Sequence, residues 1–339
     1  MFFQSRKSLF ACLAIGVLLL ISDDSTASTV NVKWISGEPF VALRDLASFY
    51  GMEYRRPSAM KVQLRSKWSD LLFDVKSRQI KVNGISVWMH EGPRRYHGDY
   101  LITRTDAQRL IDPVLRPYRH LKGALPKVVV LDPGHGGKDK GAVGSRNVQE
   151  KLAALDIAKR TRSHLAKMGI KALLTRENDR FISLQKRVDL ADRWKADLFV
   201  SIHLNASSSV TAKGIETYIL TSPGFPSTNT HSRKRIKKLR YPGTAYDHRS
   251  TVAGYAIQSR MLGSTGAADR GLRQARFYVL KNALFPAVLV EGAFLSNNYE
   301  QAKIIDAAYR DEIAEGIARG ILDYFNHCRK ASLDSSGSR

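Results

Sequence analysis

Two histidines follow short apolar runs of the chain. His135 follows Val128–Leu131 and lies in a glycine-rich turn, and His203 follows Ala196–Ile202. Short runs of this kind, rich in β-branched residues, predict buried strands. Functional groups of open α/β sheets gather beyond the carboxyl ends of the strands, so both imidazoles are expected at one edge of a sheet.

Carboxylates occur at comparable positions. Glu291 directly follows the apolar run Pro286–Val290, where an unpaired charge would cost several kcal/mol, and Glu150 begins the helix expected after the His135 turn. Asp132 is a further candidate, although an Asp before Pro-Gly more often builds the turn itself. Two imidazoles and a carboxylate are the ligand set of a catalytic zinc ion with one position open to water. A second carboxylate is what such a site needs as its general base.

Four motifs, DPGHGGKDKGA, QEK, SIHLNA and VEGAFLSN, occur in this order. Together they resemble the zinc-dependent N-acetylmuramoyl-L-alanine amidases of the amidase 3 type, over about residues 127–325. The resemblance implies one zinc ion held by His135, Glu150 and His203, with Glu291 as the general base. It also implies hydrolysis of the amide bond between N-acetylmuramic acid and the L-alanine of the peptidoglycan stem peptide.

Other functions remain open at this stage. A zinc peptidase or carboxypeptidase acting on the stem peptide would use the same ligand set, and a non-catalytic wall-binding protein could keep the same fold. The presence of all four site residues favours the hydrolase. Arg176 and Asp179 also match a family motif, but a structural ion pair explains them equally well.

The charge and the first residues point to export. The 339 residues include 54 Lys and Arg against 31 Asp and Glu, a net charge of +23, which predicts an acidic partner. Residues 1–27 have the pattern of a signal peptide, with Arg6 and Lys7 before the apolar core Ser8–Ile21 and small residues up to Ala27. An exported protein, in the periplasm or outside the cell, meets the wall before nucleic acid, so no nucleic-acid partner is expected.

The remaining chain predicts two domains. Residues 28–112 predict a small α+β domain that resembles the stalk module of copper amine oxidases, without implying copper, and 113–126 is a proline-containing linker. Residues 127–328 predict an α/β catalytic domain, a mainly parallel twisted sheet flanked by helices on both faces, as in zinc amidases and phosphorylase/hydrolase-like folds. Residues 329–339 are expected to be a disordered tail. A monomer is expected.

Three local predictions complete the sequence analysis. Phe277–Leu280 is expected to be a short strand, and Tyr309–His327 is expected to be the closing helix. Thr221–Ser250 fits no predicted element and contains the basic run Arg233–Arg240. This run is a candidate for gating the site, with an activator protein as partner, or for contact with an anionic wall polymer or membrane surface. A solvated basic loop is the alternative.

Overall fold

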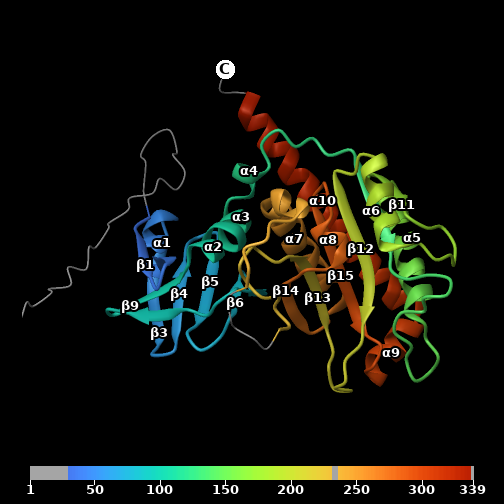
Figure 1. Cartoon of the computed structure of the whole chain (residues 1–339), viewed down its shortest axis with the longest axis horizontal. Helices are drawn as coiled ribbons and strands as arrows, with labels where there is room; N and C mark the ends of the chain where they lie inside the picture. The colour runs from blue at the N-terminus through green and yellow to red at the C-terminus, as the bar shows by residue number, and fades with distance from the viewer. Residues whose placement is uncertain (1–29, 231–235, 337–339) are drawn as a thin grey trace, which may run out of the picture.

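The computed structural model describes residues 30–230 and 236–336 (Figure 1). The predicted signal peptide and Arg233–Arg235 therefore lie outside the described residues. None of the helices in the described ranges is both long enough and apolar enough to cross a membrane.

The catalytic half is built on six strands in the order β11-β10-β12-β15-β13-β14. All neighbours in this series are parallel except β13 and β15, which run antiparallel. The predicted mainly parallel sheet is confirmed. The strands are β10 (Val128–Pro133), β11 (Lys171–Leu174), β12 (Leu198–Asn205), β13 (Ile215–Leu220), β14 (Asp269–Ala275) and β15 (Ala287–Phe294).

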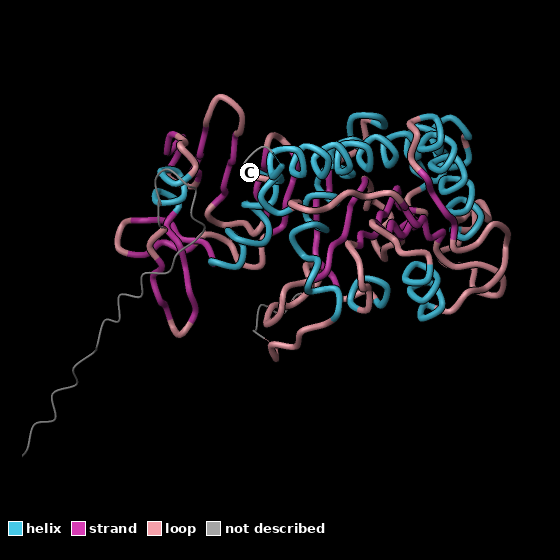
Figure 2. The backbone as a smooth tube through the Cα atoms, turned by 90° about the horizontal axis from the view of Figure 1, so that it is seen from above, coloured by secondary structure: helices cyan, strands magenta, loops and turns pink. Residues whose placement is uncertain are grey.

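Helices cover both faces of this sheet, as predicted (Figure 2). Successive residues of a strand point to opposite faces, so Val129 packs in one hydrophobic cluster and Val130 in the other. The first cluster includes residues of α5 (Glu150–Lys167), α7 (Asp247–Thr265) and α10 (Ala307–Ser336). The second includes residues of α6 (Leu184–Arg193) and α8 (Tyr278–Lys281), and α9 (Asn298–Ile305) follows β15.

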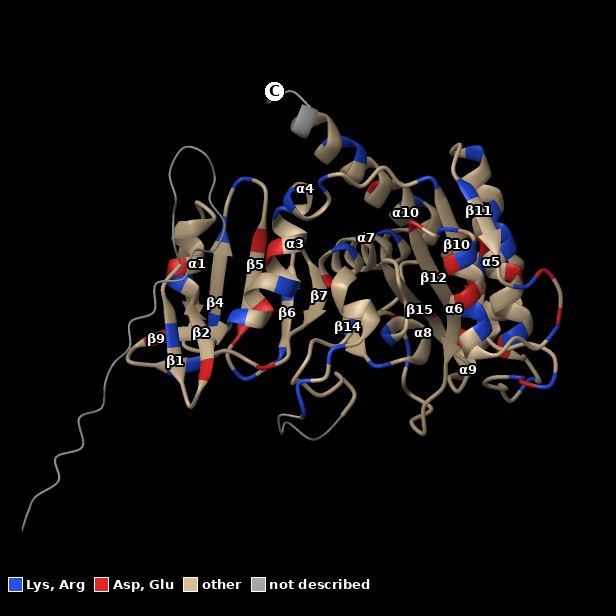
Figure 3. Ribbon diagram, turned by 45° about the horizontal axis from the view of Figure 1, so that its top comes forward, with Lys and Arg blue, Asp and Glu red and all other residues tan. Residues whose placement is uncertain are grey.

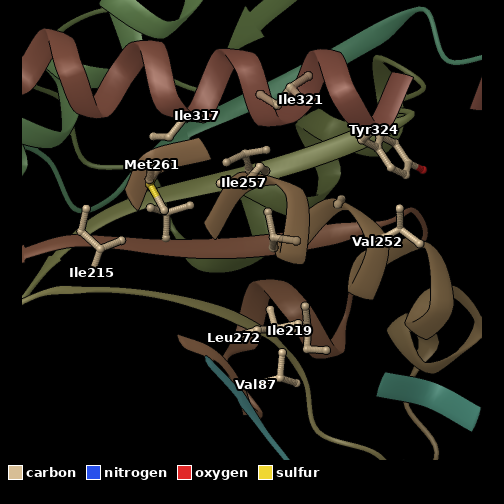
Figure 4. Packing of buried hydrophobic residues seen from close by; sticks show 14 of the residues in the cluster. Val87, Ile215, Ile219, Val252, Ile257, Met261, Leu272, Ile317, Ile321 and Tyr324 are labelled. Carbon is tan, nitrogen blue, oxygen red and sulfur yellow. The ribbon is translucent and has the colours of Figure 1, made fainter. Parts of the chain in front are cut away.

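The helices α7 and α10 approach each other closely. A Cβ atom added at Gly316 would lie 2.6 Å from the Met261 Cα atom, and one added at Gly320 would lie 2.4 Å from the Ile257 Cα atom. Glycine at these two positions therefore lets the helix backbones come together. Ile317 and Ile321 of α10 pack in the same cluster as Ile257 and Met261 (Figure 4).

The N-terminal module contains nine strands and helix α1 (Leu43–Phe49). Four strands form a separate antiparallel sheet in the order β1-β2-β9-β8. Asn83 and Gly84 form the turn of the hairpin that joins β6 to β7. The strands are β1 (Val32–Ile35), β2 (Glu38–Ala42), β3 (Glu53–Ser58), β4 (Lys61–Arg65), β5 (Asp70–Asp74), β6 (Gln79–Val82), β7 (Ile85–Trp88), β8 (Arg94–Tyr96) and β9 (Asp99–Thr103).

The other five strands of the module extend the catalytic sheet. The strand β7 pairs parallel with β14 through Val87 and Leu272, which gives one 11-stranded sheet that ends at β3. The Trp88 Nε1 atom donates a hydrogen bond of 2.9 Å to the carbonyl oxygen of Arg270 across the same seam. The two predicted domains thus share one sheet.

The segment predicted as a linker, 113–126, is partly helical. After α2 (Arg104–Asp106) and the π-helical turn η1 (Ala107–Ile111), the chain forms α3 (Asp112–Leu115) and α4 (Pro117–His120). Leu121 is fully buried in the large core cluster. Because an apolar side chain of this segment belongs to the core, the segment is a packed connection.

Three further local predictions are wrong. Phe277–Leu280 is not a strand, since α8 covers most of it, and the strand β14 precedes it. The 221–250 segment ends in the 3-10 turn η2 (Pro242–Tyr246), after which α7 begins at Asp247. The tail is helical up to Ser336, because α10 continues and packs the buried Ala331 into the core.

Candidate metal centre and active site

Three parallel strands bring the predicted site residues to one edge of the sheet. The strands β10, β12 and β15 are neighbours, and His203 of β12 lies in register with Glu291 of β15. His135 follows the end of β10 by two residues in a left-handed conformation, with φ +59°. The Gly134 N–H donates to the Ile202 carbonyl oxygen at 2.9 Å, which ties the His135 turn to β12.

Glu150, the first residue of α5, lies between the two histidines. Its Oε1 atom is 3.1 Å from His135 Nε2 and 2.8 Å from His203 Nδ1. Its Oε2 atom accepts a hydrogen bond of 2.8 Å from the Ala142 N–H. One possible ligand atom from each of the three residues lies within 4.8 Å of the others. The structure therefore brings together the predicted set His135, Glu150 and His203.

The donor set fits a zinc ion. Two imidazole nitrogens converge on one carboxylate oxygen, and imidazole with carboxylate is a usual zinc ligand combination. Asp139 Oδ2 lies 2.9 Å from His135 Nδ1, a contact that orients a ligating histidine and leaves its Nε2 atom for a metal. Burial alone would raise the pKa of Glu150, but hydrogen bonds from His135 and His203 lower it well below its usual range.

Two glycines leave room for the ligand side chains. A Cβ atom at Gly134 would lie 2.3 Å from the His203 ring. A Cβ atom at Gly141, where φ is +65°, would lie 2.5 Å from Glu150 Oε2 and 2.6 Å from the His135 ring. Glycines of the first motif thus provide space as well as backbone freedom.

Glu291 lies beside the three converging residues. It lines the same cavity of about 280 Å³ as His135 and His203. Its Oε2 atom is buried and has no hydrogen-bond partner within the described part of the chain. Burial raises the pKa of Glu291 well above its usual range, and the charges of Glu150 and Glu216 raise it further. The site therefore combines a metal-type donor cluster with a separate, poorly solvated carboxyl group.

Two mainly apolar walls flank this cavity, and the sequence analysis did not find them. One wall comes from the segment before and at the start of α6, and the other from the start of α8. Tyr278 donates a hydrogen bond to Gln185 Oε1 and so connects α8 to α6. The sequence shows these residues only as two short, mainly apolar stretches, 181–184 and 277–280, and the second was predicted as a strand. The wall residues are Phe181, Ile182, Leu184, Phe277, Tyr278 and Val279.

Asp132, the alternative carboxylate, belongs to the framework of the site. It accepts hydrogen bonds from Thr175 Oγ1 at 2.6 Å, Ser201 Oγ at 2.9 Å and Arg187 Nη1 at 2.7 Å. Arg187 also donates to the His135 carbonyl oxygen at 2.7 Å. Its guanidinium group holds the His135 turn in place, a role that the sequence analysis missed because the contacts are to backbone oxygens.

Arg176 and Asp179 are structural residues, but not as one ion pair. Buried Arg176 donates to the carbonyl oxygens of Gly134 and Lys151, both at 2.7 Å. Asp179 accepts from the Gly137 N–H at 2.7 Å and pairs with Lys151 Nζ at 2.6 Å. Burial lowers the pKa of Arg176 to about 10, with the Arg187 charge adding to the shift. Both residues fix the loop that carries His135.

The 221–250 segment, which contains the basic run, contacts the N-terminal module through residues that the structure describes. The Phe225 ring lies 4.1 Å from the His90 ring, centroid to centroid, and Lys238 Nζ lies 3.7 Å from Glu38 Oε1. Among the described residues of 221–246, none lines the cavity beside His135 and His203. Lys and Arg residues occur on both halves of the protein (Figure 3).

Comparisons with known proteins agree on one family. A family model described as N-acetylmuramoyl-L-alanine amidase matches residues 129–323. The chain is 38% identical over 199 residues to the N-acetylmuramoyl-L-alanine amidase LytC of Bacillus subtilis, a match that covers 59% of this chain and 36% of LytC. It is 36% identical over 221 residues to AmiA of Escherichia coli, covering 59% of this chain and 76% of AmiA.

A solved structure has the same catalytic fold. The N-acetylmuramoyl-L-alanine amidase from Clostridium difficile 630 matches with a TM-score of 0.50 and 35% identity, over 60% of this chain and 98% of that chain. The chain spans only about a third of the length of LytC. The N-terminal module lies outside the residues that the family model matches.

Proposed function

Because the chain belongs to the N-acetylmuramoyl-L-alanine amidase family, we propose that it hydrolyses the amide bond between N-acetylmuramic acid and the L-alanine of the stem peptide of peptidoglycan. The observation that supports this most is the convergence of His135, Glu150 and His203 next to Glu291 in one cavity. The proposed place of action is the cell wall, reached by export to the periplasm or the outside of the cell.

We assign the metal-ligand role to His135 Nε2, His203 Nδ1 and the Glu150 carboxylate. A zinc ion bound by these atoms would polarise the scissile carbonyl group and lower the pKa of a water molecule toward neutrality. Asp139 holds the His135 ring through its Nδ1 atom. Arg187 and Arg176 hold the backbone of the same turn, so the ligands are positioned before substrate enters.

Glu291 is the proposed general base. Its buried Oε2 atom has no other partner in the described residues, so it is available to a water molecule in the cavity. A carboxylate whose pKa is raised by burial takes up a proton more readily than an exposed one. In this assignment Glu291 takes a proton from the attacking water and then gives it to the nitrogen of the leaving L-alanine.

Digestion of purified peptidoglycan by the zinc-loaded protein tests the assignment. Mass analysis is expected to find free stem peptides that begin with L-alanine, together with uncut glycan. Glu291→Gln should lower kcat/KM at least about 100-fold while zinc content is retained. Glu312→Gln, a change at an exposed residue of α10, is the matched control and should keep activity.

Two outcomes would contradict the proposal. Products shortened within the peptide would indicate a peptidase acting on the same wall material. Full activity of Glu291→Gln would remove Glu291 from the mechanism.

The basic run Arg233–Arg240 is proposed as a contact for an anionic wall polymer or membrane surface. Its described residues 236–240 are exposed and include Lys237, Lys238 and Arg240. Binding of the protein to whole walls should weaken steeply with salt and with deletion of Arg233–Arg240. Unchanged binding after the deletion would reduce the segment to a solvated loop. We also propose that the protein is a monomer and that an activator protein acts on the site through this run.

A further inference from the structure

Lys138 and Lys281, the two rim lysines, each lie against an aromatic ring of one cavity wall. Lys138 Nζ lies 4.9 Å from the centroid of the Phe181 ring, and Lys281 Nζ lies 5.6 Å from the centroid of the Tyr278 ring. Both rings line the cavity. Neither lysine forms an ion pair with a carboxylate among the residues that the structure describes. The rim thus presents two positive charges that are not neutralised by the protein.

Three other basic groups near the cavity are committed to internal contacts. Arg187 is paired with Asp132, Arg176 binds backbone carbonyl oxygens, and Lys151 is paired with Asp179. These groups build the site and are buried or nearly so. The two rim lysines therefore differ from them in having charge available for a ligand.

The proposed substrate carries negative charge close to the bond that is cut. The second residue of the stem peptide is a D-glutamate joined through its γ-carboxyl group, so its α-carboxylate can be free. At about 3.5 Å per residue, this carboxylate lies roughly 7 Å from the scissile nitrogen. It approaches a cavity lined by Asp139 and Glu291, two carboxyl groups that are outside the set assigned to zinc. Positive charge at the rim offsets that repulsion.

We propose that Lys138 and Lys281 bind the carboxylates of the stem peptide and so determine a preference for stem peptides whose second residue has a free α-carboxylate. This inference rests on the proposed amidase function. The apolar parts of the same walls, Phe181 and Val279 among them, are suited to the methyl groups on either side of the scissile bond. The two lysines would then favour a second stem-peptide residue that carries a free α-carboxylate over one whose α-carboxyl group is amidated.

A pair of small substrates isolates this contact. N-acetylmuramoyl-L-alanyl-D-glutamate and its α-amide, the D-isoglutamine form, differ only in the group that the lysines would bind. The measured quantity is the ratio of kcat/KM for the acid to kcat/KM for the amide. Lys138→Gln and Lys281→Gln should each lower this ratio about two- to fivefold, the range of a partly exposed ion pair. Higher salt should lower the ratio of the wild-type protein in the same direction.

The control is a lysine in the same local setting but far from the cavity. Lys67 Nζ lies 4.8 Å from the Trp68 ring in the N-terminal module, and Lys67→Gln should leave the ratio unchanged. Lys138→Arg keeps the charge and should keep most of the ratio. The dissociation constants of both compounds in a Glu291→Gln background give a second measure, which does not depend on turnover.

The outcomes separate the two levels of the proposal. Cleavage of both compounds with a ratio that the Lys→Gln variants do not change would refute the inference and leave the amidase function standing. An equal loss on acid and amide would also refute it, because that result indicates a structural role. Failure of the zinc-loaded wild-type protein to release stem peptides from purified peptidoglycan would refute the amidase function and this inference with it.

Discussion

The seam between the two halves can be tested at Trp88. Its indole N–H donates to the Arg270 carbonyl oxygen, and its carbonyl oxygen accepts from Gln274 Nε2 at 3.0 Å. The Arg273 guanidinium lies 4.7 Å from the centroid of the Trp88 ring. Arg273 in turn pairs with buried Glu216, whose strand neighbour in β15 is Glu291. Trp88→Ala removes the side chain that joins β7 to this group.

The expected loss of stability follows from the contacts that disappear. The hydrogen bond contributes about 1 kcal/mol, the stacking of Arg273 on the ring about 1 kcal/mol, and burial of part of the ring about 1–2 kcal/mol. The sum, about 3–4 kcal/mol for this half-buried ring, lies in the lower part of the range for replacing a core Trp by Ala. Trp34→Ala is the matched control, because this ring is 57% exposed, and it should cost less than about 1 kcal/mol.

The readout is urea unfolding monitored by hydrogen exchange of the backbone amides. Because one sheet runs through both halves, amides of β5 and of β12 should lose protection in one transition, and Trp88→Ala should move both together. Two separate transitions, with only the N-terminal one shifted, would refute the view that the halves form one cooperative unit. A shift for Trp88→Ala no larger than that for Trp34→Ala would refute the energetic argument.

Three further predictions concern the proposed zinc ligands and the connection between the halves. Asp139→Asn should weaken zinc binding about 10–100-fold in a competition with a chelator, because His135 loses its orienting carboxylate, and unchanged affinity would contradict this. Gly141→Ala should also lower zinc affinity, with little change in far-ultraviolet circular dichroism, because the added methyl group displaces Glu150 or the His135 ring; wild-type affinity would be the contrary result. Burial, aided by the neighbouring His120 and Arg109 charges, lowers the pKa of His248 to about 4, so the unfolded state binds the extra proton below about pH 6.5. The free energy of unfolding should therefore fall by about 2 kcal/mol between pH 6.5 and 4. His248→Asn, measured by urea unfolding, should show a smaller fall over the same range. An equal fall would contradict the lowered pKa of His248.

The site was predictable because its geometry follows from local sequence. A short apolar run that ends in His or Glu fixes both the strand and the place where the side chain emerges, and parallel strands bring those places together. This reasoning placed His135, His203 and Glu291 at one edge, which the structure confirms. Glu150 needed the family resemblance, because a Glu at the start of a helix is common without any function.

Other features depended on contacts between distant segments. The strand β14 was missed because Asp269, Arg270 and Arg273 interrupt its apolar pattern, and their charges are balanced by Lys81 and Glu216 from other strands. The end of α10 was missed because Ala331 is buried against a core that the local sequence does not reveal. The shared sheet could not be inferred either, since β7 and β14 have one register pair, Val87 with Leu272, and the hydrogen bonds across the seam link residues 182 and 183 apart in sequence.

The seam also has a consequence for how the chain reaches its native state. Ser86 and Asp269, which bond across it, are 183 residues apart, so β7 must wait for most of the polypeptide before its partner strand exists. Contacts of such long range slow folding, and until they form, β7 and β14 each present an unpaired edge that can join other chains. Completion of the sheet is therefore a late event. A chain cut short before β14 leaves the N-terminal strands with an open edge.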